Sequence, residues 1–126
     1  MYIRFVITQI DEDSHQPQGL FVAVAELLRS GTLTPDEHEK LQHERAWFNT
    51  NLPSPDRSDI RGRAIFWFRA SAYECIQRMW NMGAILRENG YLMEVQKCDH
   101  LHNIVYRDEF QVAAFPHLYD GNRTFK

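Results

Sequence analysis

The sequence predicts an α+β domain of two layers, in which the helices pack on one face of a small mixed sheet. Three observations predict it: an alternating segment at the start of the chain, three helical segments after it, and alternating segments up to residue 116. Elements in the order β-α-α-α-β-β-β bury their apolar faces by stacking the helices on the sheet. The 126 residues are expected to form a single globular domain, 1–126, with residues 118–126 as a loose tail.

The first strand is predicted at residues 2–8, where apolar side chains alternate with polar ones and Val6 is the exception. A polar loop follows. Residues 19–30 then carry apolar side chains at helical spacing. Gly31 stands where a left-handed C-cap belongs, so we expect the first helix to end there.

The second helix has a clear start signal. Thr34 can cap the helix, Pro35 fits its first position, and Glu37 completes a capping box. Apolar residues then share one face until Pro53, which ends the helix. This combination predicts the start of the helix more sharply than its end.

The third helix is predicted at residues 72–89, with Trp80 on its apolar flank and Gly90 as its stop. We interpret Trp80 as part of the core, and a groove or a dimer surface is the alternative. The apolar run at 64–68 is too short to show a period. We favour an extended or turn segment there, and a short helix is the alternative.

The last part of the chain predicts three strands. Residues 91–98 alternate, and residues 103–116 read as a β-hairpin around a turn at 107–109. In this hairpin Ile104 and Tyr106 are expected to oppose Val112 and Ala114.

Composition and charge limit the class of protein. Apolar residues make up 44% and charged residues 25%, which is typical of a globular domain. The net charge of −3 offers no attraction to phosphate backbones or anionic membranes, so we expect neither a nucleic acid nor a membrane as partner. Cys75 and Cys98 show no repeated spacing, and the chain starts without a signal sequence, which predicts reduced thiols in a cytoplasmic protein.

Two segments carry a resemblance to other proteins. They are Trp67-Phe68-Arg69 before a long helix with Met79-Trp80, and the hairpin Ile104-Val105-Tyr106-Arg107-Asp108-Glu109-Phe110-Gln111-Val112-Ala113. The chain resembles a group of small bacterial proteins without assigned function, in which a Pro-Gly turn precedes the hairpin and the hairpin reads Tyr-Glu-Asp. Here His102-Asn103 and Tyr106-Arg107-Asp108 stand instead. The resemblance implies a bacterial protein and shared structural positions, and it implies no activity or cofactor.

Acidic residues and histidines follow the predicted strand ends. If the strands at 2–8 and 91–98 are parallel, their carboxyl ends lie at one edge of the sheet, where ligands bind in open α/β sheets. Carboxylates and imidazoles together can hold a divalent metal. The alternative is that they are ordinary polar loop residues. The candidate metal ligands are Asp13, His15, Asp99, His100, His102 and His117, with Asp11 beside them.

A second candidate site is a groove lined by aromatic and arginine side chains. Trp47, Trp67, Arg63 and Arg69 are the candidate ligand-binding residues. Aromatic rings dominate the energetics of interfaces, and guanidinium groups bind carboxylates or phosphates in a bidentate manner. The alternative is that the rings belong to the core and the arginines form local salt bridges.

The sequence favours a small non-enzymatic domain without a cofactor, which binds a protein partner or forms a homodimer. Four apolar residues are expected on the sheet face away from the helices, and an exposed apolar face needs a cover. They are Val6, Val105, Ala113 and Phe115. The alternative function is a metal-dependent hydrolase, in which the metal activates water at the His/Asp rim.

Overall fold

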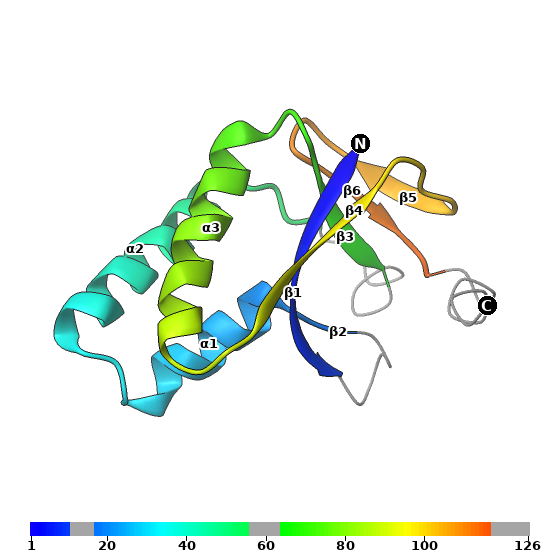
Figure 1. Cartoon of the computed structure of the whole chain (residues 1–126). Helices are drawn as coiled ribbons and strands as arrows, with labels where there is room; N and C mark the ends of the chain where they lie inside the picture. Colours follow the sequence, from blue (N-terminus) through cyan, green and yellow to red (C-terminus); the bar gives the residue numbers. More distant parts are fainter. Residues whose placement is uncertain (11–16, 56–63, 117–126) are drawn as a thin grey trace.

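The computed structural model describes residues 1–10, 17–55 and 64–116, and it has the predicted α+β class (Figure 1). The predicted order of elements is incomplete, because the observed order is β-β-α-α-β-α-β-β-β. The additional strands are β2 (Pro17–Gly19) and β3 (Ile65–Arg69). The extended segment that we favoured for residues 64–68 is thereby confirmed, and the alternative of a short helix is wrong. The pentapeptide is a strand because it pairs with neighbours on both of its edges.

The sheet is centred on β1 (Tyr2–Ile10). One edge of β1 pairs with β4 (Met93–Cys98), and its other edge pairs first with β3 and then with β2. Beyond β3 follow β6 (Gln111–Ala114) and β5 (Ile104–Arg107), which form the predicted hairpin. Ile104 opposes Ala114 as expected, but a register shift places Tyr106 opposite Ala113.

Every strand pair in the described sheet is antiparallel, so the predicted mixed sheet with β1 parallel to β4 is wrong. The reason lies in the connection from β3 to β4. These two strands flank β1 on opposite edges, and the helix between them carries the chain across β1. They are therefore parallel to each other and antiparallel to the strand between them.

The first two helices begin and end at the predicted signals. α1 (Leu20–Ser30) stops at Gly31, which has a φ of 74°. α2 (Pro35–Asn51) begins with the predicted capping box. The Thr34 hydroxyl accepts a hydrogen bond from the Glu37 amide at 3.1 Å, and the Glu37 carboxylate accepts one from the Thr34 amide at 3.1 Å.

α3 (Tyr73–Glu88) also ends as predicted. Gly90 has a φ of 93°, and its amide donates to the carbonyl oxygen of Arg87 at 3.2 Å. The Tyr91 amide donates to the carbonyl oxygen of Leu86 at 3.0 Å. These two bonds form a Schellman motif, which returns the chain directly into β4.

The helices lie on one face of the sheet, and the core fills the space between them (Figure 1). Phe5 and Ile7 of β1 contribute from the sheet, and Leu41 and Phe48 contribute from α2. Trp80 is 43% exposed, so its placement in the core is corrected. The buried face of α3 is instead formed by Cys75, Met79, Met82, Gly83 and Leu86.

The open apolar surface expected on the face away from the helices is not found at Val6 or Ala113. Val6 is 0% exposed, and Val105 and Phe115 are half-buried. Ala113 pairs with Phe66, which shares a face of β3 with the core residue Phe68, so Ala113 lies on the helix side and its expected placement is wrong. All four residues of β6 are buried, so this strand is covered on both sides.

The turn of the β5–β6 hairpin is held by one carboxylate. Asp108 accepts hydrogen bonds from the amides of Phe110 and Gln111 at 2.8 and 2.9 Å, and from the Tyr106 hydroxyl at 2.7 Å. The buried Gln111 side chain donates to Asp108 and to the carbonyl oxygen of Pro53 at 2.7 Å. The hairpin is thus tied to the segment that leaves α2.

Candidate functional site

Three of the six predicted metal ligands belong to the part of the chain that the structure describes. Tyr2 pairs with Cys98, so Asp99, His100 and His102 follow β4 near the start of β1. The other three candidates, Asp13, His15 and His117, lie outside the described residues. The antiparallel register removes the reason to expect all six at one edge.

The described part of this rim consists of exposed side chains. Asp99, His100 and His102 are exposed, and the Cys98 thiol donates to the carbonyl oxygen of His100 at 2.6 Å. Within residues 1–10, 17–55 and 64–116, no three His, Cys, Asp or Glu side chains form a group that could hold a metal ion. The metal-dependent hydrolase stays a prediction that depends on residues outside these ranges.

The candidates for the aromatic groove lie on opposite sides of β3. Trp47 of α2 packs against the helix-side core, as does Phe68 of β3. Because side chains alternate along a strand, Trp67 and Arg69 point to the other face. The Arg69 guanidinium donates to the carbonyl oxygen of Asp108 at 2.9 Å, so it braces the hairpin. Arg63 lies outside the described residues.

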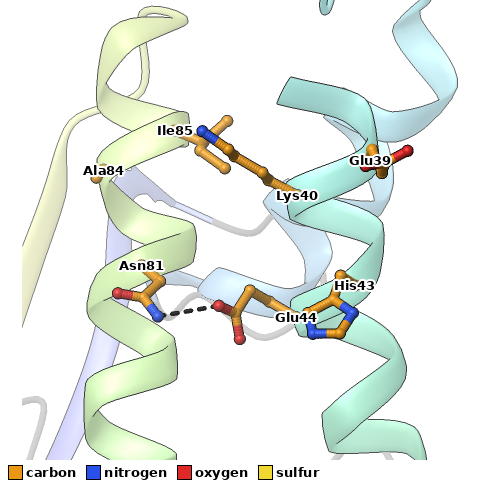
Figure 2. A pocket seen from close by; sticks show the side chains of 7 residues that line it. All are labelled: Glu39, Lys40, His43, Glu44, Asn81, Ala84 and Ile85. Carbon is orange, nitrogen blue, oxygen red and sulfur yellow. Dashed lines mark hydrogen bonds between the residues drawn. The ribbon is translucent and has the colours of Figure 1, made fainter. Parts of the chain in front are cut away.

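A groove of about 710 Å³ runs between α2 and α3 (Figure 2). No local sequence pattern indicates this groove, because it joins residues that are about forty positions apart. Figure 2 shows the Lys40 side chain reaching from α2 toward Ile85, while a hydrogen bond joins Glu44 to Asn81 across the groove. The lining residues are Glu39, Lys40, His43, Glu44, Asn81, Ala84 and Ile85.

Beside this groove, an ionic network joins the two helices. Glu44 accepts hydrogen bonds from Arg78 and Asn81, each at 2.9 Å, and Arg78 also bridges to Glu74 at 2.9 Å. The Arg78 guanidinium lies 4.5 Å from the centre of the Trp47 ring. Burial alone lowers the pKa of Arg78, but the hydrogen bonds to Glu74 and Glu44 outweigh it and raise the pKa. These groups hold α2 against α3 rather than offer free acids or bases.

Large apolar side chains are exposed along the outer face of α3. Tyr73 is 78% exposed and Trp80 is 43% exposed, and the two residues are seven positions apart. Ala84 is exposed four residues further on. Positions at these intervals share one face of a helix. The result is an apolar stripe that borders the groove on one side.

β4 borders the same stripe on its other side. Met93 occupies the space that a Cβ atom on Gly83 would need, so α3 and β4 approach closely. Figure 1 shows β4 crossing beside β1 with α3 next to it. Of the described strands, β4 pairs with β1 alone. Its second edge therefore faces outward next to the apolar stripe.

The direction of the backbone groups of β4 follows from one hydrogen bond. The Thr8 amide donates to the carbonyl oxygen of Leu92 at 3.1 Å, and this pair continues the register of Ile7 with Met93. Hydrogen-bonded pairs alternate with non-hydrogen-bonded pairs in an antiparallel ladder. Alternate β4 residues therefore point their N–H and C=O groups away from β1. These residues are Met93, Val95 and Lys97.

We define the α3/β4 surface as two neighbouring parts. The first is the apolar stripe of Tyr73, Trp80 and Ala84, and the second is the row of outward backbone groups of Met93, Val95 and Lys97. A sequence signal for the stripe exists, because Tyr73 and Trp80 are seven residues apart on a helix. The edge position of β4 has no such signal, since the order of strands in a sheet depends on distant segments.

Comparison of the chain with protein-family models, curated proteins and solved structures finds no match. In the part of the chain that the structure describes, no helix is both long and apolar enough to cross a bilayer.

Proposed function

We propose that this protein is a non-enzymatic domain of the bacterial cytoplasm that binds a protein partner on its α3/β4 surface. The observation that carries the proposal is the exposed Trp80 beside the outward edge of β4. Tryptophan and tyrosine are the residues most enriched at binding hot spots. An unpaired strand edge adds a row of hydrogen-bonding groups that a partner chain can use.

Two further observations support binding over catalysis. Burial raises the pKa of the Cys75 thiol to about 11, so this thiol is a packed core group rather than a nucleophile. The Asp108 carboxylate is engaged by the Tyr106 hydroxyl and by two backbone amides. Both groups serve the fold, whereas Tyr73 and Trp80 expose large apolar area that the fold does not use.

Site-specific photo-crosslinking tests this proposal in intact cells. A photoreactive residue in place of Gln77 lies on the exposed face of α3 between Tyr73 and Trp80. We expect a protein adduct from this position, and we expect its loss when Trp80→Ser is added. The matched control is the same label in place of Gln42, an exposed residue of α2. The proposal fails if position 77 gives no adduct or gives the same adducts as position 42.

A further inference from the structure

We infer that the partner is a second copy of this chain, joined through a two-fold axis at Val95 of β4. The inference rests on the proposed function, because it uses the same α3/β4 surface and names its occupant. Two β4 strands would pair antiparallel at their outward edges and extend one sheet into the next. The two α3 helices would then pack across the axis on the same side of this sheet.

The register of such a pairing follows from the outward groups of β4. A two-fold axis perpendicular to the sheet keeps each side chain on its own face of the sheet. Odd-numbered residues of β4 therefore pair with odd-numbered residues of the second copy, and even-numbered with even-numbered. With the axis at Val95, this residue exchanges two hydrogen bonds with Val95 of the second copy. Met93 does the same with Lys97 of the second copy. All three are the residues whose backbone groups already point outward.

The side chains of β4 also suit this register. Glu94 lies opposite Gln96 of the second copy, and Met93 lies opposite Lys97, whose aliphatic stem can cover it. An axis shifted by one residue toward the N-terminus would place Glu94 opposite Glu94. Like charges in directly opposite positions are destabilising, which disfavours that register.

Trp80 lies at the level of the same axis. Its ring meets Phe5 at 5.4 Å in a T-shaped contact, and Phe5 is the register partner of Val95. The contact of Gly83 with Met93 agrees with this level for Trp80. From Trp80 to Gly83 the helix rises about 4.5 Å, and from Val95 to Met93 the strand covers about 6.6 Å in the same direction. A two-fold axis at Val95 therefore brings Trp80 toward Trp80 of the second copy.

The position of α3 over the sheet satisfies the spacing that two packed helices need. Gly83 lies against β4 and Trp80 lies against Phe5 of β1, so α3 runs above the gap between these strands. With strands about 4.8 Å apart, α3 lies about 5 Å from the axis, and the two helices lie about 10 Å apart. Helices pack with their axes about 8–10 Å apart, so the sheet and the helices can close in one dimer.

Charge along α3 matches the same axis. Tyr73 lies seven residues before Trp80, and Arg87 lies seven residues after it. The two-fold axis places Arg87 of the second copy level with Tyr73. An arginine beside an aromatic ring is a favourable contact, and the symmetry supplies it twice.

The test is the mass of the full chain in solution, measured by sedimentation velocity from low to high micromolar concentration. We expect a dimer whose dissociation constant rises about tenfold or more in Lys97→Pro, because proline removes an outward N–H on both copies. Lys97→Ala is the matched control: it keeps the outward N–H and loses only the side-chain contact with Met93, so it should weaken the dimer much less than Lys97→Pro. Proline is tolerated on an edge strand where its N–H would face outward, so the fold should survive.

A second variant covers the case in which Lys97→Pro does not fold. Arg87→Glu is expected to weaken the dimer, and Arg87→Lys is expected to keep most of it. A monomer at every concentration overturns the inference, as does a dimer that neither Lys97→Pro nor Arg87→Glu weakens. An adduct from position 77 to a different protein, together with a monomeric mass, overturns the inference while the proposed function stands. A monomeric mass without any adduct removes both.

Discussion

Phe5 and Trp80 meet edge to face at 5.4 Å with an interplanar angle of 88°, although Phe5 is 2% exposed and Trp80 is 43% exposed. The contact joins the centre of the sheet to the outer face of α3. One side of the tryptophan ring stabilises the fold, and the other side is open to a partner. A residue in this position has two measurable roles.

Trp80→Ala should therefore cost less stability than a core truncation. We expect a loss of about 2 kcal/mol in the free energy of unfolding, against about 3–5 kcal/mol for Phe48→Ala, since Phe48 is 3% exposed. Urea denaturation at low protein concentration measures both values. Equal losses in the two variants would place Trp80 in the core and remove its part in the α3/β4 surface.

Thr34→Ala should lower the stability by about 1 kcal/mol, because α2 loses the hydroxyl that caps the Glu37 amide. Thr34→Ser keeps this hydroxyl and serves as the control. The midpoint of urea denaturation distinguishes the two variants. An unchanged midpoint in Thr34→Ala would show that the capping box contributes nothing.

Because Asp108 ionises in the hairpin turn, we expect the free energy of unfolding to depend on pH. Burial raises the pKa of Asp108, but the hydrogen bonds from Tyr106, Phe110 and Gln111 outweigh burial and lower it below the ordinary value of 3.8. Because the pKa of Asp108 is lower in the folded than in the unfolded state, its ionised carboxylate stabilises the fold when the pH lies above the ordinary pKa. This stabilisation is lost as the pH falls through the lowered pKa of the folded state. Asp108→Asn should be less stable near neutral pH and should lose less on acidification. Parallel pH profiles for both proteins would contradict this account.

Thiol labelling should separate the two cysteines. Cys75 is 1% exposed and burial raises its pKa to about 11, whereas Cys98 is partly exposed. We expect the native protein to react at Cys98 only, and both thiols to react in denaturant. Mass spectrometry after iodoacetamide treatment identifies the modified residue. Rapid native labelling of Cys75 would show that α3 opens from the core.

The sequence predicted the local features well, because their causes lie within a few residues. The capping box of Thr34 and Glu37 and the stop at Gly31 depend on hydrogen bonds and backbone angles inside one turn of chain. The hairpin was predicted for the same reason. Even its register shift, which places Tyr106 opposite Ala113, is a small departure from the expected pairing.

The features that the sequence missed depend on distant segments. The five-residue β3 shows no period of its own, and only its pairing with β1 and β6 makes it a strand. The direction of β4 against β1 follows from the crossover of α3. Trp80 was predicted on the same flank of α3 as Met79, but neighbouring positions of a helix point in different directions, and Trp80 is exposed while Met79 is buried. The Glu44–Arg78 pair joins residues whose meeting no local pattern indicates.

Amide hydrogen exchange along β4, followed residue by residue by NMR, tests the role of the α3/β4 surface most directly. The Gln96 amide points to β1, and the Val95 amide points outward. In dilute protein we predict slow exchange at Gln96 and fast exchange at Val95. As the concentration rises into the range where the dimer forms, exchange at Val95 should slow toward that of Gln96. Fast exchange at Val95 at every concentration and in cell extract, with Gln96 still protected, would contradict docking at this edge.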